Sequence, residues 1–333
     1  MTRAVVWLLL LSLFSLGAQA QAQWLQRSAD IMGTRVVIQL WSESVGAGEV
    51  AIEAVLEELR RIDRAMSPFR SDSELSRVNQ QAAQGAVVIS DELYGVLARA
   101  QQISELSDGA FDITFASVGH RYDYRRGIRP SEQQLEQLLP MIDYQHLVLT
   151  PDPPRLAFAR PGVRIDLGGI AKGYAVDRGI AILQQHGIEH ALLSAGGDSR
   201  FLGDRRGRLW RVGVRDPDDK AGIRALLPLS NTALSTSGDY ERFFIQDGER
   251  YHHILNPRSG RSAKGLRSVS VLGAEAITTD ALSTALFVLG RQAAMALVER
   301  LPGIEAVLVD TEGRLHFSSG LGQAGQSAAA ALD

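Results

Sequence analysis

Residues that could do chemistry gather in four short segments, each richer in glycine, acid and hydroxyl than packing requires. The first, residues 166–173, reads Asp-Leu-Gly-Gly-Ile-Ala-Lys-Gly, with Asp166 at the expected end of a strand and Lys172 on the opening turn of a helix. Exposed backbone amides and the helix dipole at such a point attract phosphate. An ordinary glycine-containing strand–helix turn has the same pattern, and the spacing matches neither a Walker A loop nor a dinucleotide fingerprint.

Two further segments combine hydroxyls, acids and histidines. Residues 194–198, Ser-Ala-Gly-Gly-Asp, by themselves favour a tight turn capped by an aspartate. Residues 235–240 are followed closely by residues 251–257, which contain His252 and His253. Neighbouring side chains of a strand point to opposite faces, so only one of these histidines can address a given pocket. No His-x-x-x-His or His/Glu spacing accompanies them, so zinc is not expected.

The fourth segment, residues 278–284, carries oxygen donors at helical spacing. Asp280 and Thr284 lie one turn apart on one helix face, with Ser283 beside them. These are the hard oxygen ligands that Mg²⁺ prefers, and few protein ligands suffice when a phosphate completes the octahedron. An aspartate placed in the first helical turn by the helix dipole explains the same residue without a metal.

The elements that must position these segments follow from hydrophobic periodicity and turn signals. Helices are expected over 47–66, 71–78, 90–107, 129–139, 171–186, 279–289 and 292–301. Strands are expected over 32–41, 147–149, 156–158, 163–166, 191–194, 210–214, 226–229, 233–236, 240–245, 268–272, 306–310 and 315–318. Helices cluster early and strands late, without regular alternation, which predicts one α+β domain with a mixed or antiparallel sheet and flanking helices.

The amino-acid composition excludes several kinds of partner and chemistry for this chain. The chain has 333 residues, no cysteine, and 35 Lys and Arg against 38 Asp and Glu. A formal net charge of −3 argues against a nucleic-acid partner, since such binders carry a clear positive excess. The absence of cysteine excludes disulfides, thiolate metal sites, cysteine nucleophiles and a lipoprotein anchor. Any chemistry must therefore use oxygen and imidazole ligands or a cofactor.

The N-terminus reads as a secretory leader. Arg3 precedes a nearly wholly apolar run over residues 4–16, and Ala18-Gln19-Ala20 supplies the small residues of a cleavage site. The run is shorter than the roughly 20 residues needed to span a bilayer, which favours cleavage over an anchor helix. We expect a signal peptide over 1–20, the domain over 21–319, a flexible tail over 320–333, and no other apolar run of membrane length. We therefore expect the protein to be exported to the periplasm, and to associate with the inner membrane if the leader is not cleaved.

Taken in order, the segments resemble the ApbE family, the FAD:protein FMN transferases. Each matching stretch is short, but eight in one order, from about residue 31 to about residue 318, are specific. The stretches are residues 32–34, 73–76, 108–112, 166–177, 196–198, 236–240, 253–257 and 280–290. The resemblance implies a single elaborate domain related to the T-fold.

The resemblance also implies roles for residues. The FAD site would be lined by Met32, Phe69, Ala110, Phe111, Asp112, Asp166, Lys172 and Leu255. Mg²⁺ would be bound by Asp280, Ser283 and Thr284 with a backbone oxygen of Gly169, while His253 would be the catalytic base and Asp280 catalytic through the metal. The family often has tyrosine where Phe69 stands. Many members carry a second acid where Ser283 stands, so a two-metal arrangement is not implied for this chain.

The implied activity is Mg²⁺-dependent transfer of the FMN part of FAD onto a Thr or Ser hydroxyl of a partner protein, through a phosphoester, with release of AMP. The acceptor would be a subunit of a membrane redox complex. Two alternatives share the site: a Mg²⁺-dependent FAD pyrophosphatase and a non-catalytic FAD-binding protein. A solute-binding protein would need two similar α/β lobes, which the order of the expected elements does not show.

Overall fold

An eight-stranded antiparallel sheet forms the centre of the computed structural model, which describes residues 22–217, 219 and 222–321. Its strands lie in the order β1-β2-β6-β7-β10-β15-β16-β17. Their bounds are Gln23–Ile31, Thr34–Ser42, Ala191–Ala195, Asp198–Leu202, Thr232–Gly238, Leu266–Gly273, Glu305–Asp310 and Leu315–Phe317. Every neighbouring pair runs antiparallel. The predicted α+β class with an antiparallel sheet is therefore confirmed.

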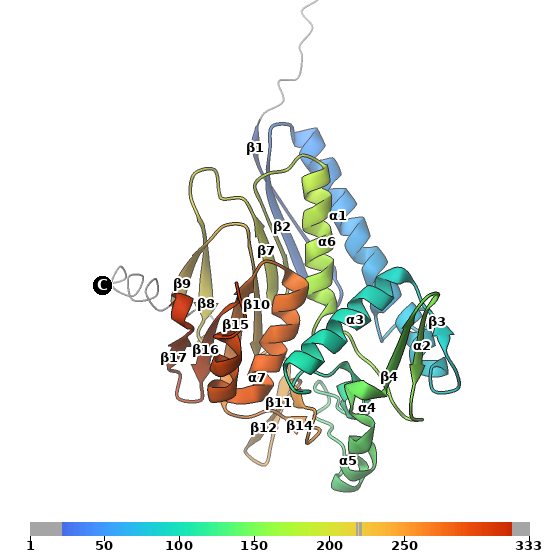
Figure 1. The fold of residues 1–333 in the computed structure, drawn as a ribbon. Coiled ribbons are helices and arrows are strands. Elements are labelled where there is room, and N and C mark those ends of the chain that lie inside the picture. Colours follow the sequence, from blue (N-terminus) through green and yellow to red (C-terminus); the bar gives the residue numbers. More distant parts are fainter. Residues whose placement is uncertain (1–21, 218, 220–221, 322–333) are drawn as a thin grey trace, which may run out of the picture.

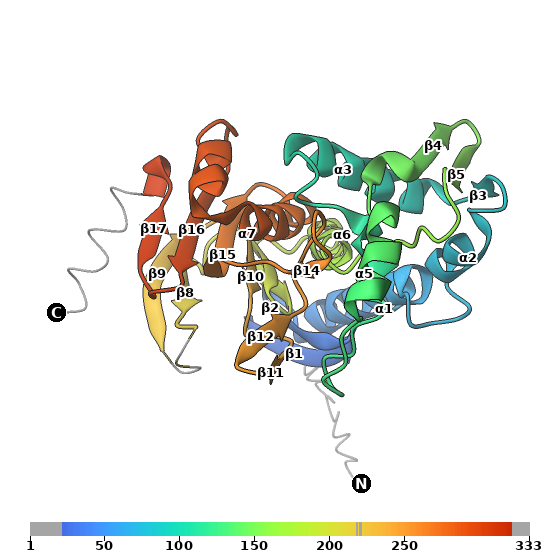
Figure 2. The ribbon, with the colours of Figure 1, turned by 90° about the horizontal axis from the view of Figure 1, so that it is seen from below.

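Three long helices cover one face of this sheet (Figure 1). They are α1 (Val45–Met66), α6 (Ala171–Gln185) and α7 (Ala276–Val298). The alternation in β2 explains the packing, because Val36, Ile38 and Leu40 are fully buried toward the helices. Seen from below, α6 lies nearly end-on between α7 and the α1 half of the molecule (Figure 2). The N-terminus of α6 is therefore held between two other helices.

The opposite face of the sheet is covered by a two-stranded ribbon, β8 (Trp210–Arg215) and β9 (Ile223–Leu229). Trp210 packs there with Phe201 of β7 and with apolar residues of β10, β15 and β16. This second apolar cluster is separate from the core under the helices. The sheet is thus buried on both faces where the ribbon crosses it.

Smaller elements form the rest of the molecule beside α1 and below the sheet. The helices are α2 (Glu74–Gln81), α3 (Asp91–Leu106), α4 (Ala116–Gly119) and α5 (Glu132–Leu138), with 3₁₀ turns Ile113–Phe115, Leu139–Met141 and Tyr144–His146. The strands are β3 (Val87–Val88), β4 (Leu147–Pro151), β5 (Pro154–Phe158), β11 (Phe243–Gln246), β12 (Glu249–His252), β13 (Leu255–Asn256) and β14 (Arg261–Ser262). Side-chain caps from Ser44, Ser73, Ser90 and Ser131 start four of the helices.

Several sequence predictions are wrong in detail, each for a physical reason. Residues 163–166 form no strand, because Ile165 gives its backbone groups to the side chain of Asn79 and Arg164 donates to Ser117. The helix expected from residue 71 begins at Glu74, since Ser73 is the residue whose hydroxyl caps it. The strand expected over 240–245 begins at Phe243.

The edge strand β1 is absent from the prediction. It buries only Leu25 and Ile31 fully, and therefore shows no alternation.

The two helices expected over 279–289 and 292–301 form one element, α7, broken at Gly290, whose φ of 74° is non-helical. In the described part of the chain, α7 is the one helix long and apolar enough to cross a membrane by length and composition. This corrects the expectation that no other apolar run approaches membrane length. The helix packs against β10, β15 and α6, and a core helix passes the same test.

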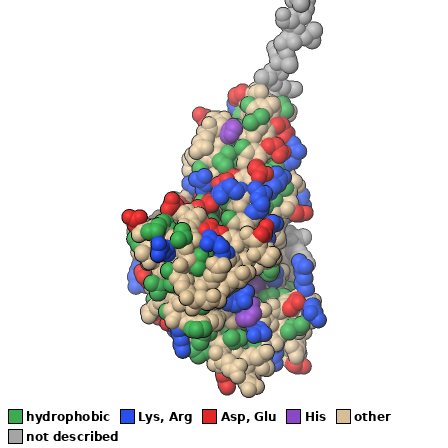
Figure 3. Space-filling view, turned by 90° about the vertical axis from the view of Figure 1, so that its right-hand side faces the viewer, with side chains coloured by type: hydrophobic (Ala, Val, Ile, Leu, Met, Phe, Trp, Pro, Cys, Tyr) green, Lys and Arg blue, Asp and Glu red, His purple; other side chains and the backbone are tan. Residues whose placement is uncertain are grey.

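The predicted ends of the domain are only partly described. Residues 1–21, which include the expected signal peptide, and residues 322–333 of the expected tail lie outside the described residues. Gly320 and Leu321, the first residues of the expected flexible tail, are instead packed on the domain. Gly320 lies against Glu305, and Leu321 packs on the second apolar cluster. On the face shown in Figure 3, basic and acidic side chains are interspersed, in keeping with the net charge of −3.

Candidate active site

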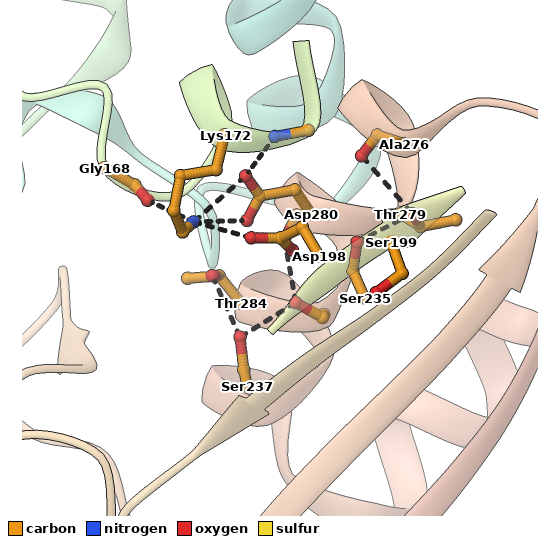
Figure 4. A network of polar contacts seen from close by, with 12 residues as sticks. Gly168, Lys172, Asp198, Ser199, Ser235, Ser237, Ala276, Thr279, Asp280 and Thr284 are labelled. Atoms are coloured by element: carbon orange, nitrogen blue, oxygen red, sulfur yellow. Dashed lines mark hydrogen bonds and ion pairs between the residues drawn. The ribbon is translucent and has the colours of Figure 1, made fainter. Parts of the chain in front are cut away.

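Lys172 lies at the centre of a polar cluster at the N-terminus of α6 (Figure 4). Its Nζ donates to the backbone oxygen of Gly168 at 2.8 Å and contacts Asp198 Oδ2 at 2.9 Å and Asp280 Oδ2 at 3.2 Å. The three partners come from the loop before α6, the start of β7 and the second turn of α7. Segments that are far apart in the sequence therefore meet at one ammonium group.

Glycine at position 173 brings α6 and α7 close enough for this meeting. A Cβ at Gly173 would lie 2.1 Å from the backbone oxygen of Ala276, closer than real contacts allow. The amide of Gly173 donates to Asp280 Oδ2 at 3.0 Å, which fixes the carboxylate from the α6 side. Asp177, one turn further along α6, accepts from the amides of Ala276 and Ile277 at 2.9 and 2.8 Å and so caps α7.

Substituting Gly173 tests this close approach. Gly173→Ala is expected to lower the free energy of unfolding by about 1–3 kcal/mol, because the added methyl group forces two packed helices apart. Gly95→Ala in α3 is the control: nothing lies within 4 Å of its added Cβ, so a gain of about 0.4–1 kcal/mol is expected there. Urea unfolding of both variants makes the comparison, and equal stability of the two would contradict the packing argument.

The charges of the cluster do not balance. Asp198 and Asp280 are 2% and 3% exposed, and they share the single ammonium of Lys172. Burial and the neighbouring Asp198 raise the pKa of Asp280, and Lys172 opposes them. Burial by itself would lower the pKa of Lys172, but the two carboxylates outweigh it, so its pKa is raised and it stays charged. Because its pKa is raised, Asp280 can take up a proton, and a cation bound in place of that proton would stabilise the charged carboxylate.

The predicted metal ligands Asp280, Thr284 and Gly169 lie together beside this cluster. A Cβ at Gly169 would be 3.3 Å from Thr284 Oγ1, so the backbone of the loop lies close to that hydroxyl. Ser283 instead points its hydroxyl to Ser237 Oγ at 2.8 Å and to the backbone oxygen of Asp280 at 2.8 Å. The described residues include no group of three His, Cys, Asp or Glu that could hold a metal. A cation here would depend on carboxylate, hydroxyl and carbonyl oxygens, a donor set that fits Mg²⁺.

The two adjacent histidines have different surroundings. His252 is buried, with Nε2 at 2.8 Å from the backbone oxygen of Ala263 and its ring edge-on to Phe287. These contacts give His252 a structural role. His253 follows β12, and its Nδ1 is enclosed without a hydrogen-bond partner in the structure. Burial, followed by the positive charge of Arg242, lowers the pKa of His253 to about 3. Its imidazole is therefore neutral at pH 7, and it becomes a better proton acceptor only when nearby negative charge raises its pKa.

The predicted FAD contacts lie on several elements around the cluster. Met32 sits in the β1–β2 turn with a φ of 56°. Asp166 accepts from the amide of Gly168 at 2.6 Å, and burial raises its pKa. Ala110 and Phe111 are buried, with Phe111 against Gly169. Leu255, in β13, is also buried.

Two predicted contacts are less directly connected. The carboxylate of Asp112 accepts from the amide and hydroxyl of Thr114 at 2.7 and 2.6 Å, so it caps a 3₁₀ turn, and burial raises its pKa to about 6. Phe69 is 88% exposed in the loop after α1, and its one hydrogen bond in the structure is to Ser67. These two roles stay predictions from the resemblance.

Sequence reasoning missed Arg242 as a site residue, and it assigned Asp198 to a turn cap and not to a contact with Lys172. The predicted tight turn at 194–198 exists, with β6 and β7 pairing Ala195 with Asp198. The Asp198 carboxylate, however, binds Lys172 instead of capping the turn. Arg242 precedes β11, and its charge reaches both Asp166 and His253. The Gly-Gly-Asp pattern marks the segment of Asp198 but not its partner, and no local pattern marks Arg242, because the groups that both residues act on lie on other elements.

Comparison with known proteins agrees with this arrangement. The sequence model of the ApbE family matches residues 32–308. The chain is 32% identical to the FAD:protein FMN transferase of Treponema pallidum, covering 92% of this chain and 90% of that protein. It is 30% identical to the FAD:protein FMN transferase of Vibrio cholerae, covering 94% and 97%.

Solved structures show the same likeness. The ApbE protein of Thermotoga maritima superposes with a TM-score of 0.83 at 34% identity, covering 90% of this chain and 98% of that one. The flavinyl transferase ApbE of Pseudomonas stutzeri, in its apo form, gives 0.81 at 31% identity, covering 91% and 97%. With the family's sequence model matching most of the chain and its fold shared throughout, this protein belongs to the ApbE family.

Proposed function

We propose that this chain transfers the FMN part of FAD onto a Thr or Ser hydroxyl of a partner protein and releases AMP. The names of its relatives support the activity. The observation that carries it to this chain is the polar cluster itself. A charged lysine, an oxygen donor set with excess negative charge and a neutral imidazole surround the N-terminus of α6. Phosphoryl transfer needs such charge neutralisation and positioning more than covalent help from the protein.

The reaction balances with the groups present. The acceptor hydroxyl oxygen attacks the phosphorus of the FMN half of FAD and forms the new P–O bond. The bond from that phosphorus to the oxygen bridging to AMP breaks, and AMP leaves with the bonding electron pair. The hydroxyl proton passes to an imidazole nitrogen of His253, which is neutral in the free protein and whose low pKa the negative charge of bound diphosphate would raise. Lys172 provides positive charge for the diphosphate.

Magnesium is part of the proposal. Asp280, Thr284 and the backbone oxygen of Gly169 would hold the ion, and Ser283 adds a nearby hydroxyl. When bound, Mg²⁺ neutralises the diphosphate and stabilises departing AMP. Asp280 would supply the carboxylate ligand, and Asp198 has its own contact with the ammonium of Lys172.

We also propose that the protein works in the periplasm on a subunit of a membrane redox complex. The apolar leader and the cleavage-site pattern at residues 18–20 support export. The acceptor class rests on the family resemblance alone.

One experiment separates the candidate activities. The protein is mixed with FAD, Mg²⁺ and a periplasmic extract, and covalent flavin is sought as a fluorescent band after denaturing electrophoresis. Transfer gives a band together with AMP. Rapid AMP and free FMN without extract would indicate a pyrophosphatase, and bound intact FAD with no band would indicate a binding protein. Either of those results would contradict the proposed transfer.

The protonation of His253 can be measured directly. Because burial and the charges of Arg242, His252 and Lys172 lower its pKa to about 3, His253 gains no proton between pH 8 and pH 5. Its imidazole C2–H resonance, assigned by its absence from a His253→Asn spectrum, is expected to stay constant over that range. A midpoint near 6.5, the ordinary histidine pKa, would contradict the enclosed neutral state. Bound diphosphate is expected to raise the pKa, since nearby negative charge favours imidazolium.

A further inference from the structure

Arg242 and His253 lie opposite each other at the open end of the β11–β12 hairpin. Its backbone oxygen accepts the His253 amide at 3.1 Å, directly beyond the paired residues Phe243 and His252. Its side chain extends back to the β1–β2 turn, where Nη2 lies 3.9 Å from the Cβ position of Gly33, next to Met32. Arg242 therefore contacts the candidate base through its backbone and reaches the turn of a predicted FAD contact through its side chain.

The electric field of Arg242 reaches two more site residues. It lowers the pKa of His253 and works against the burial that raises the pKa of Asp166. The charge of Lys172 likewise lowers the pKa of both His253 and Asp166. Because a base must lie within hydrogen-bond reach of the attacking hydroxyl, the reacting phosphorus would lie near His253, whose backbone is paired with that of Arg242 across the hairpin.

The guanidinium of Arg242 has no acidic partner among the residues that the structure describes. Arg250 of the same hairpin differs, because it is ion-paired with Asp239 at 3.3 Å. The neighbouring Glu241 contacts Arg215 at 3.6 Å. Arg242 is exposed and keeps its donors available for a ligand.

We propose that Arg242, together with Lys172, binds the diphosphate of FAD. This inference rests on the proposed function, in which FAD is the substrate. A planar guanidinium donates two parallel hydrogen bonds to phosphate oxygens, which a lysine cannot do. Arg242 thereby fixes the orientation of the phosphorus relative to His253, to which it is tied through the hairpin.

The test compares ligands with and without phosphate. Affinities of Arg242→Gln for FAD and for riboflavin are measured by flavin fluorescence with Mg²⁺ present. Loss of a charged hydrogen-bonding group is expected to raise the Kd for FAD about 10- to 100-fold and leave the Kd for riboflavin unchanged. The matched control is Arg211→Gln, an exposed arginine of β8 on the ribbon side of the sheet, for which both affinities should equal those of the wild type.

Other results would overturn the assignment. An equal loss for FAD and riboflavin would show that Arg242 contacts the flavin ring or supports the fold, and an unchanged FAD affinity would show that it contacts no phosphate. The His253 resonance is a second readout, because removing the Arg242 cation is expected to raise the pKa of His253. Failure of the wild-type protein to bind FAD would instead refute the proposed function, so the two failures are distinguishable.

Discussion

Replacing His253 with asparagine is expected to slow FMN transfer about 10²- to 10⁴-fold while FAD binding changes little. Asparagine keeps a similar shape at the end of β12 but cannot take the proton of the acceptor hydroxyl. The diphosphate contacts proposed for Lys172 and Arg242 lie on other elements. The rate is measured as AMP released with acceptor present, and binding by flavin fluorescence.

His186→Asn is the control for this substitution. His186 is the exposed residue that ends α6, at the opposite end from Lys172. Transfer by that variant should match the wild type. A His253→Asn protein that transfers FMN at the normal rate would show that another group takes the proton, and a large loss of FAD affinity would show that His253 acts in binding.

Local sequence patterns predicted the scaffold of the site better than its contacts. The apolar residues of α1 and β2 repeat at the periods of a helix and a strand, so these elements were found within a few residues. The spacing of Asp280 and Thr284 is set by the helix itself, so their shared face was also predictable. Such features depend on neighbours in sequence.

Contacts between distant segments could not be read in the same way. The ion pair of Lys172 with Asp198 depends on how the β6–β7 turn meets the N-terminus of α6, and the enclosure of His253 depends on Arg242 and the surrounding fold. The lowered pKa of His253 follows from such contacts, namely burial and the charge of Arg242. Burial and nearby charges decide the pKa values of these groups, and residue spacing predicts neither.

Replacing Lys172 with methionine is expected to lower the free energy of unfolding by about 3 kcal/mol when divalent cations are removed. The change leaves Asp198 and Asp280, both nearly buried, without the ammonium they share. Breaking a buried pair costs about 3–5 kcal/mol, and the lower end applies because Lys172 is 25% exposed. Urea unfolding in EDTA measures the loss.

Magnesium is expected to restore much of that stability, because an ion on Asp280 supplies the positive charge that the variant lacks. The wild type should gain less from Mg²⁺, since Lys172 already offsets part of the negative charge. Lys264→Met, which removes an exposed lysine paired with Glu249, should change little in either buffer. A Lys172→Met protein as stable as the wild type in EDTA would mean that the two carboxylates do not depend on this ammonium. If Mg²⁺ stabilised the variant and the wild type equally, the ion would bind elsewhere, because the charge freed by the substitution lies only on Asp198 and Asp280.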